Sequence, residues 1–367
     1  MLGLLHRHRT SSIACDAGAS GARLCQVRAN GASRTICEAL SLNVSIRNDG
    51  PAGFPTIDTA RVARTVANGD FSGRELCLVL SPPLVRFTPL HMPPAVLNQS
   101  QSRIESAIKL EVSRGQREPG EDTEVRWWRL PRAVGQQPNI MAVSLPTEAA
   151  MACHTQLASV GLQLKRVDVA PCALARAARV LSASPETDVC GILDLGAKQT
   201  TLTMVVEGTP VYVRELPLTG PKWTNAIADS LHISPEMAET VKRRAGITGG
   251  SASPHEAEGE LTDERLPSVL FSVLRQPLEA LVQEIVDCFS YVFRSNHDMH
   301  SGRLWLAGGG AKLPGLCDYL EVTCGMSVRP LARSAVSGEN AKIDTRCEFD
   351  AESAACFGAA LLDAEGT

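Results

Sequence analysis

Two aspartates in this chain share one setting, at the end of an apolar run and two residues before a glycine. Asp16 opens the segment Asp16–Ser20, and Asp194 opens the segment Asp194–Thr200. This setting predicts a carboxylate at the end of a strand and a turn whose backbone amides can approach a phosphate. Two carboxylates can also orient a hydrated Mg²⁺, which keeps several of its waters. Two such turns facing each other would hold a polyphosphate and its magnesium ion.

A third segment has the composition of a loop that a ligand can approach closely. Gly308, Gly309 and Gly310 follow the apolar run Arg303–Ala307, and Leu313–Gly315 then opens a helical pattern. Consecutive glycines let a flat or charged ligand lie against the backbone, because no side chain stands in the way. A tight turn between a strand and a helix needs fewer glycines, so this loop is predicted to bind a ligand.

A fourth group of charged residues lies late in a helix that is predicted to begin after Ser234 and Pro235. Glu239 and Lys242 are three residues apart and therefore share one face of that helix. Considered alone, this spacing is typical of an ion pair on a protein surface, which stabilises a helix by a few tenths of a kcal/mol.

The elements that would position both aspartates are predicted by two similar stretches, residues 12–40 and 190–217. In each stretch an apolar strand ends in Asp-x-Gly-Ala, and a second strand, a glycine-containing turn and a third strand follow. The first of these turns is Asn30-Gly31, a dipeptide that supplies the positive φ of a tight hairpin. A helical pattern follows each copy, at Asp58–Ala67 and at Trp223–Ile233. We therefore expect a duplicated α/β domain.

The composition disfavours several classes of protein. With 44% hydrophobic and 21% charged residues, the 367-residue chain is typical of a folded protein of two or three domains. Its net charge of −4 disfavours nucleic-acid binding, which more often uses a strongly basic surface. No apolar run reaches the roughly 18 residues of a membrane-spanning helix, and Met1–Arg9 is too short and too charged for a secretory signal.

Cysteine is abundant, with 12 residues, but no C-x-x-C pair occurs and the spacings are irregular. Most of the cysteines lie in apolar runs, where a reduced thiol behaves as a small hydrophobic side chain. A chain of this length needs no disulfide framework, so we expect reduced cysteines and a cytosolic protein. His297 and His300 have no partner at a spacing typical of a zinc site.

The order of the four segments resembles the actin-like ATPase superfamily and, within it, the PilM family of type IV pilus assembly proteins. The resemblance covers nearly the whole chain, and the glycine-rich segment is its most specific part. By this resemblance the phosphates are bound by two motifs, a first with Asp16, Gly18, Ala19 and Ser20 and a second with Asp194, Gly196, Ala197, Lys198 and Thr200. A helix that contacts adenine and ribose carries Glu239, Lys242 and Arg243. The adenosine motif consists of Gly308, Gly309, Gly310, Ala311 and Lys312. Asp16 and Asp194 would hold Mg²⁺.

This resemblance implies a fold, a location and a partner. The fold is a duplicated actin-like, ribonuclease H-like α/β fold, in which two halves enclose a nucleotide cleft and one half carries a small α+β insert of the type seen in FtsA and PilM. The protein would bind ATP with Mg²⁺ in the cytoplasm, at the inner face of a bacterial inner membrane. It would belong to a type IV pilus assembly complex and dock the cytoplasmic tail of a PilN-like membrane protein.

Some residues depart from the family pattern. Arg23 stands where the first phosphate loop of relatives often has Lys, and Gly21 makes that loop looser. Hydrolytic members of the superfamily position the attacking water with a Glu or Gln near the segment that Val169–Ala173 matches, but only Asp168 precedes it here. We therefore expect ATP binding with at most weak hydrolysis. Lys198 could contact a phosphate or be an ordinary solvated lysine.

The expected layout has four parts. These are a first core half (residues 1–88 and 151–189), the insert (89–150), a second core half (190–230 and 303–367, closed by the helix Ala354–Leu362) and a helical subdomain (231–302). The helical subdomain is expected to contain a flexible loop at Gly246–Glu264 and a helical stretch at Leu266–Phe293, interrupted at Pro277.

The insert is expected to contain a helix at Asn98–Glu111, a loop over Arg114–Glu124 and strands at Glu124–Leu130 and Asn139–Ser144. Trp127 and Trp128 would then lie on opposite faces of one strand. One ring is expected to pack in the core, and the other to pack there or to contact another protein.

Other assignments of function stay open. The chain could be a scaffold of a type II secretion system or an MSHA pilus without nucleotide turnover, a small-molecule kinase of the same fold, or an FtsA-like division protein. A kinase needs a carboxylate base near the acceptor hydroxyl, and no candidate for it stands in a suitable glycine-bounded loop. An FtsA-like protein would carry a C-terminal amphipathic membrane helix, which is not predicted after Leu362. Self-association is possible in any of these assignments.

Overall fold

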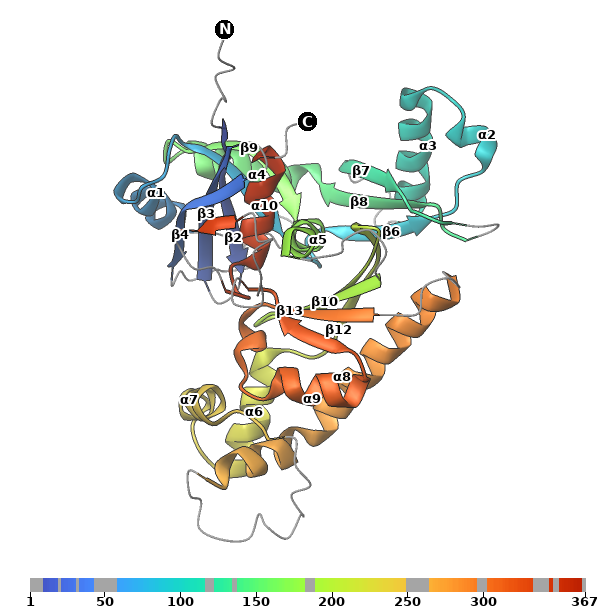
Figure 1. The fold of residues 1–367 in the computed structure, drawn as a ribbon. Coiled ribbons are helices and arrows are strands. Elements are labelled where there is room, and N and C mark those ends of the chain that lie inside the picture. The colour runs from blue at the N-terminus through green and yellow to red at the C-terminus, as the bar shows by residue number, and fades with distance from the viewer. Residues whose placement is uncertain are drawn as a thin grey trace, which may run out of the picture.

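Two β-sheets, with helices between and around them, make up the two halves of the protein in the computed structural model (Figure 1). The structure describes residues 9–18, 21–30, 33–42, 58–115, 122–133, 137–181, 189–248, 264–295, 302–332, 343–345 and 350–364. The first sheet contains β1 (Arg9–Thr10), β2 (Ile13–Gly18), β3 (Gly21–Asn30), β4 (Ser33–Leu42), β5 (Glu75–Leu80), β9 (Gln163–Val169) and β15 (Ile343–Thr345). The second contains β10 (Val189–Leu195), β11 (Thr200–Val206), β12 (Thr209–Leu216), β13 (Gly302–Ala307) and β14 (Ser327–Pro330).

The two sheets repeat one topology, which confirms the predicted duplication. The first sheet has the order β15-β4-β3-β2-β5-β9, and its part β4-β3-β2-β5-β9 matches the order β12-β11-β10-β13-β14 of the other sheet. The central strands β2 and β10 each pair antiparallel with the next strand in sequence and parallel with a later one. Asp16 pairs with Val79 of β5, and Asp194 pairs with Ala307 of β13. The two aspartates therefore occupy equivalent places at the carboxyl ends of equivalent strands.

Two helices, α5 (Ala170–Leu181) and α10 (Ala354–Ala364), pack against each other between the sheets (Figure 1). Nearly every α10 side chain is buried, and a helix that is apolar all round must be covered on all sides. The expected layout assigned residues 303–367 to the second half. In the structure, however, α10 packs on β2 and β3, and β15 pairs with β4, so the end of this segment lies on the first sheet.

The outer helices cover the sheets. The first sheet carries α1 (Thr59–Asn68) and α4 (Thr147–Ala158), and the second shares one hydrophobic core with α6 (Gly220–Leu231), α7 (Pro235–Ala245), α8 (Leu266–Ser295) and α9 (Leu316–Cys324). The predicted interruption at Pro277 is wrong, because α8 continues through it. Buried Leu274 and Leu278 hold the helix against the core on both sides of the proline, which offsets its cost of about 3 kcal/mol.

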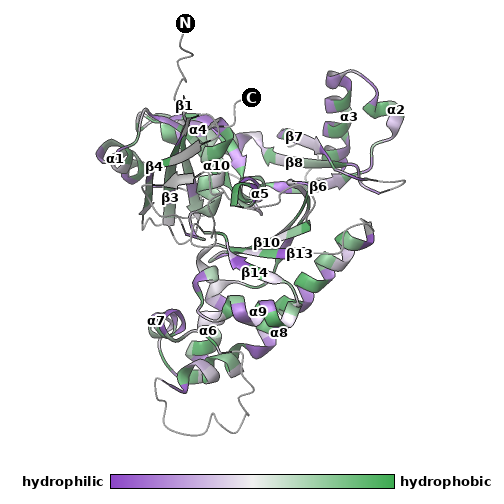
Figure 2. Ribbon diagram, in the orientation of Figure 1, coloured by the Kyte–Doolittle hydropathy of each residue, from purple (hydrophilic) through white to green (hydrophobic). Residues whose placement is uncertain are grey.

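Hydrophobic and hydrophilic residues alternate along α8, consistent with one buried face (Figure 2). None of the helices in the described part of the chain is long and apolar enough to cross a lipid bilayer. Most of the predicted loop at Gly246–Glu264 lies outside the described residues.

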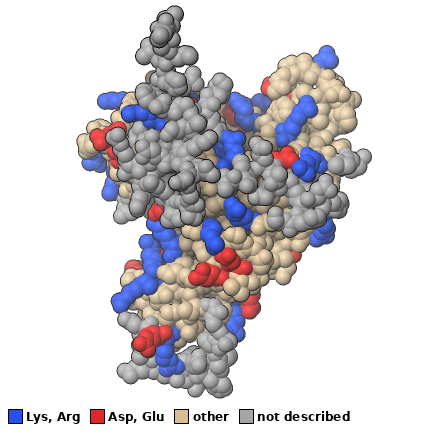
Figure 3. All heavy atoms as spheres, viewed as in Figure 1, with Lys and Arg blue, Asp and Glu red and all other residues tan. Residues whose placement is uncertain are grey.

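The insert is a three-stranded sheet of order β6-β8-β7, formed by β6 (Arg86–Leu90), β7 (Thr123–Arg129) and β8 (Ile140–Pro146). Two helices accompany it, α2 (Pro94–Leu97) and α3 (Gln101–Arg114). Trp127 packs in the core beneath α3, whereas Trp128 contacts Phe87 and donates a hydrogen bond to the carbonyl of Pro210 in the second half. The second ring therefore contacts a distant part of the same chain. On the face seen in Figure 3, basic and acidic side chains are interspersed.

Candidate functional site

A cavity of about 540 Å³ lies between the two halves, at the strand ends that carry Asp16 and Asp194. All four segments singled out in the sequence contribute to its walls. The predicted residues that line it are Asp16, Gly18, Asp194, Gly196, Ala197, Lys198, Glu239, Lys242, Arg243, Gly308, Gly309, Gly310 and Lys312. Thr200 and Ala311 are buried beside the cavity but do not line it, and Ala19 and Ser20 lie outside the described residues.

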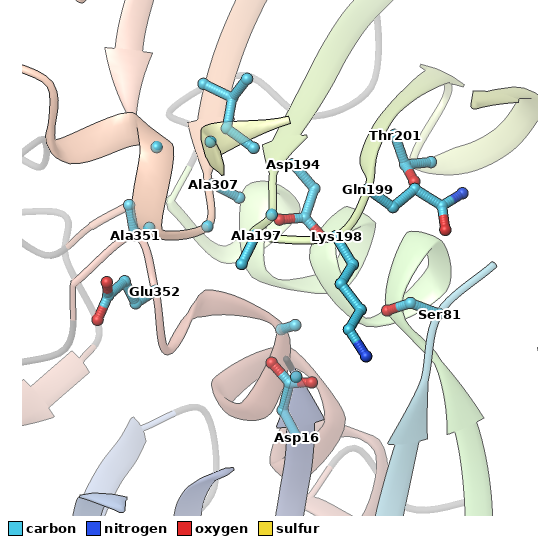
Figure 4. Close-up of a pocket in the computed structure, with 18 of the residues that line it drawn as sticks. Asp16, Ser81, Asp194, Ala197, Lys198, Gln199, Thr201, Ala307, Ala351 and Glu352 are labelled. Carbon is cyan, nitrogen blue, oxygen red and sulfur yellow. The ribbon is translucent and has the colours of Figure 1, made fainter. Parts of the chain in front are cut away.

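The two aspartates project toward the same space from opposite halves (Figure 4). Burial raises the pKa of Asp194 to about 7; the negative charge of Asp16 contributes to this rise, and Arg23 opposes it. Burial also raises the pKa of Asp16, again against the effect of Arg23. A cation between these two half-buried carboxylates would stabilise their ionised forms, because it offsets both the burial and their mutual repulsion.

The donor chemistry of this pair fits Mg²⁺ better than a metal held by protein ligands alone. No group of three or more His, Cys, Asp or Glu side chains placed to hold a metal ion occurs in the described ranges of the chain. Two carboxylates leave most coordination positions of Mg²⁺ to water and to the oxygens of a ligand, which is how this ion is commonly bound.

The glycines beside Asp194 keep the cavity wall close to the carboxylate. A Cβ atom on Gly308, which has a φ of +77°, would lie 2.5 Å from Asp194 Oδ1, and one on Gly310 would lie 2.7 Å from Leu195 Cβ. Gly196 is similarly confined, because its Cβ would lie 2.5 Å from the carbonyl oxygen of Gln199. Backbone therefore forms this wall, and a ligand can approach it without meeting side chains.

The charged residues of α7 form a compact network at one end of the cavity. The Lys242 ammonium donates to Glu239 Oε2 at 2.5 Å and to Thr224 Oγ1 at 2.7 Å, and Arg243 Nε donates to Glu239 Oε1 at 2.7 Å. Burial tends to raise the pKa of Glu239, but the hydrogen bonds from Lys242, Thr224 and Arg243 lower it to about 2. Lys242 is only 8% exposed. The surface ion pair that the spacing suggested is thus a partly buried element of the cavity wall.

Glu352 is a cavity residue that no sequence pattern predicted. Its Oε2 lies 3.3 Å from a guanidinium nitrogen of Arg23 on β3 and 3.1 Å from Lys312 Nζ on the glycine-rich loop. It therefore joins the two halves across the cavity. No motif marks Glu352, since its partners lie far away in the sequence.

Other lining residues were also missed, notably Trp223 on α6 and the segment Ser81–Leu84. Ser81 follows the buried strand β5, which pairs with β2, so the end of that apolar run could have identified it. Lys198 is exposed and extends into the space near Asp16 and Ser81 (Figure 4).

The end of β9 and the helix α5 that directly follows it bring no charged group to the cavity. Asp168 is buried, forms an ion pair with Arg176 and accepts a hydrogen bond from the Val169 amide at 2.8 Å. Burial raises the pKa of Asp168, and the Arg176 charge opposes this rise. Among the described residues of α5, Leu174 lines the cavity.

The repeated sheets, the paired central helices and a cavity walled by equivalent strand ends define an actin-like fold. The model of the family described as type IV pilus assembly protein PilM matches residues 132–345, more than half of the chain. The chain therefore belongs to the PilM family of type IV pilus assembly proteins.

Comparison with one solved structure agrees with this fold. A solved structure described as a PilM–PilN type IV pilus biogenesis complex superposes with a TM-score of 0.70 at 22% identity, covering 96% of this chain and 98% of that one. The ethanolamine utilization protein EutJ from Carboxydothermus hydrogenoformans gives a TM-score of 0.49 at 14% identity, covering 96% and 89%.

One curated relative matches over a shorter region. The cell division protein FtsA of Borreliella burgdorferi is 26% identical over 152 residues, which are 38% of this chain and 35% of that protein. The matched region thus spans about a third of the length of the relative.

Proposed function

We propose that this protein is an ATP-binding, actin-like scaffold of the type IV pilus assembly machinery. The observation that carries the proposal is the convergence of four separate segments on one cavity between two halves of repeated topology. This cavity offers opposed carboxylates, backbone walls and a cationic network, which together suit a nucleotide with its magnesium ion.

Each part of the nucleotide would have its own set of residues. Asp16 and Asp194 would hold Mg²⁺, and the turns that follow them would bind the phosphates through backbone amides. Arg23 and Lys198 would supply positive charge to the phosphates. The α7 network of Glu239, Lys242 and Arg243 would bind ribose and adenine beside the glycine-rich loop. Bound Mg²⁺ would neutralise phosphate charge.

We expect slow turnover of ATP. Positioning an attacking water requires a hydrogen-bonding group within reach of the terminal phosphate. Asp168 is already engaged by Arg176, and Leu174, the α5 residue that faces the cavity, is apolar. ATP binding, rather than ATP hydrolysis, would then determine whether the cavity between the halves is open or closed.

The partner we propose is the cytoplasmic tail of a PilN-like membrane protein. The support is membership of the PilM family and likeness to a structure described as a PilM–PilN complex. The tail would dock in a groove that involves the insert and would keep the protein at the cytoplasmic face of the inner membrane. Nucleotide would then change the affinity for the tail by shifting the balance between open and closed halves.

Calorimetric titration with ATP and Mg²⁺ tests the nucleotide site. We expect micromolar binding to the wild type and a loss of at least about 100-fold, or about 2.7 kcal/mol, in Asp194→Ala, because one metal ligand is removed. Asp229→Ala is a matched control, since Asp229 is exposed on α6 and does not line the cavity.

Two outcomes would contradict the proposal. Absence of binding at millimolar ATP would leave a scaffold that works without nucleotide, and equal binding by Asp194→Ala would place the nucleotide elsewhere. Repeating the titration with the tail of a PilN-like protein tests the partner, because coupled sites must change each other's affinity reciprocally.

Glu352→Gln is expected to tighten ATP binding about fivefold, equivalent to about 1 kcal/mol. Glu352 now neutralises Arg23 and Lys312 across the cavity, and its negative charge competes with the phosphates for them. Asp318→Asn on α9 removes the same charge without touching the cavity and should change the affinity by less than about twofold. Unchanged or weaker binding in Glu352→Gln would show that Glu352 has only a structural role.

A further inference from the structure

The insert contacts the second half at two places remote from the cavity. Trp128 Nε1 on β7 donates a hydrogen bond to the Pro210 carbonyl on β12, with a length of 2.9 Å. Arg132, just after β7, forms an ion pair of 2.6 Å with Glu207. All four residues lie near the tip of the β11–β12 hairpin or at the end of β7. We call these two contacts together the latch.

The backbone at both ends of the ion pair adopts an unusual conformation. Glu207 and Arg132 have φ values of +51° and +57°, a region that residues other than glycine seldom occupy. Glu207 precedes Gly208 in the hairpin turn, so the turn presents its carboxylate toward the insert. The ring of Trp128 is also braced, since it packs edge-to-face against Phe87 at 6.3 Å. Both partners are thus held in position by their own elements.

The two contacts of the latch are weak enough to break reversibly. The side chains of Arg132 and Glu207 are 41% and 37% exposed, and an ion pair of this exposure contributes little stability. The Trp128–Pro210 bond is partly buried, yet it is a single hydrogen bond. A small movement of the insert relative to the second half would therefore break both contacts.

Helix α5 lies between the two sheets (Figure 1) and contacts both the cavity and the β11–β12 hairpin. Leu174 near its start lines the cavity, whereas Arg179 lies beside the hairpin turn, 3.4 Å from where a Cβ of Gly208 would be. A rotation of the halves about α5 that narrowed the cavity would therefore move the β11–β12 hairpin away from the insert. A second connection exists, since the cavity-lining segment Ser81–Leu84 leads directly into strand β6 of the insert.

From this geometry we infer that the Trp128–Pro210 and Arg132–Glu207 contacts are a latch. By joining the insert to the second half, the latch keeps the two halves apart at the cavity, and it couples closure of the cavity to the position of the insert. Nucleotide binding would open the latch, and release of the latch would favour nucleotide binding. This inference rests on the proposed function for its ligand. The mechanical coupling itself can be tested without any nucleotide.

The test compares Trp128→Phe/Arg132→Gln with a matched control, Trp127→Phe/Arg126→Gln. Trp127 packs in the core of the insert, and Arg126 contacts Glu124 and the Val125 carbonyl on the same strand. Spectroscopic labels are introduced as non-canonical residues at Leu110 on α3 and Val322 on α9, which are 52% and 83% exposed. This choice avoids labelling the 12 native cysteines. The distance between the labels then reports how the insert moves relative to the second half.

Without nucleotide, we expect the distance distribution of the latch variant to be at least about twofold broader than that of the wild type and the control. With ATP and Mg²⁺, the variant should bind at least about threefold more tightly, which is about 0.65 kcal/mol. The charge reversal Arg132→Glu/Glu207→Arg should restore the narrow distribution that either single change widens.

An unchanged distribution in the latch variant would overturn the inference whatever the protein binds. Unchanged ATP affinity together with a broader distribution would also overturn it, since the latch would then have no link to the cavity. A wild type that does not bind ATP would refute the proposed function alone, and the distance measurement without nucleotide would still decide whether the latch restrains the insert.

Discussion

Gly358→Ala should lower the free energy of unfolding by about 3 kcal/mol, because α5 and α10 touch at this residue. A Cβ atom on Gly358 would lie 1.8 Å from the carbonyl oxygen of Ala173, a distance that no packing can accept. The two helices would have to separate. They would also disturb the hydrogen bond from Arg176 Nε to the Gly358 carbonyl, now 3.0 Å, and with it the buried Asp168–Arg176 ion pair.

The sign of this effect distinguishes packing from intrinsic helix propensity. Gly358 lies inside α10, where alanine would otherwise stabilise a helix by about 1 kcal/mol relative to glycine. Urea unfolding of the full chain measures the difference. Equal or greater stability in Gly358→Ala would mean that α5 and α10 do not approach this closely. We also expect weaker ATP binding in the variant, since these helices join the two halves.

Gly315→Ala is expected to lower stability by about 3 kcal/mol or more and to weaken nucleotide binding as well. Gly315 has a φ of +81°, and its Cβ would lie 1.9 Å from the Ile247 carbonyl oxygen. The same contact region contains the hydrogen bond of 2.9 Å from the Ile247 amide to the Pro314 carbonyl. This backbone contact joins the end of α7 to the glycine-rich loop, and both carry residues of the cavity wall.

Gly325→Ala is the matched control for that substitution. Gly325 has a φ of +64° at the end of α9, but no atom lies within 4 Å of a Cβ there, so only backbone strain of about 1–2 kcal/mol is expected. Urea unfolding and ATP titration of both variants separate strain from steric clash. Equal losses of stability in the two variants, with ATP binding unaffected, would contradict a tight contact between α7 and the glycine-rich loop.

Local patterns predicted most of the strands and helices, and the errors have identifiable physical causes. The helix predicted at Asp58–Ala67 forms as α1, with Asp58 as its N-cap, because capping and periodicity depend on residues a few positions apart. Pro277 was predicted to interrupt a helix by the same local logic. There the burial of neighbouring leucines outweighs the proline, and burial depends on what packs against α8 from elsewhere in the chain.

In the cavity too, features that depend on residues close in sequence were predicted, whereas features that depend on distant residues were not. A strand that ends in Asp-x-Gly places its carboxylate at the edge of a sheet wherever that strand lies, so Asp16 and Asp194 could be selected from the sequence. The charged residues of α7 looked like a surface pair, because nothing in their spacing reveals that Thr224 and the cavity wall would bury Lys242.

The chain alone specified its repeated strand–turn–strand units, its strand-end carboxylates and its family, because each of these depends on residue types at short, regular spacing. It could not reveal that Glu352 meets Arg23, that α10 crosses to the first sheet or that Trp128 reaches Pro210. These contacts join residues far apart in the chain. They form because buried surfaces of complementary shape bring the halves, the central helices and the insert together in the tertiary structure.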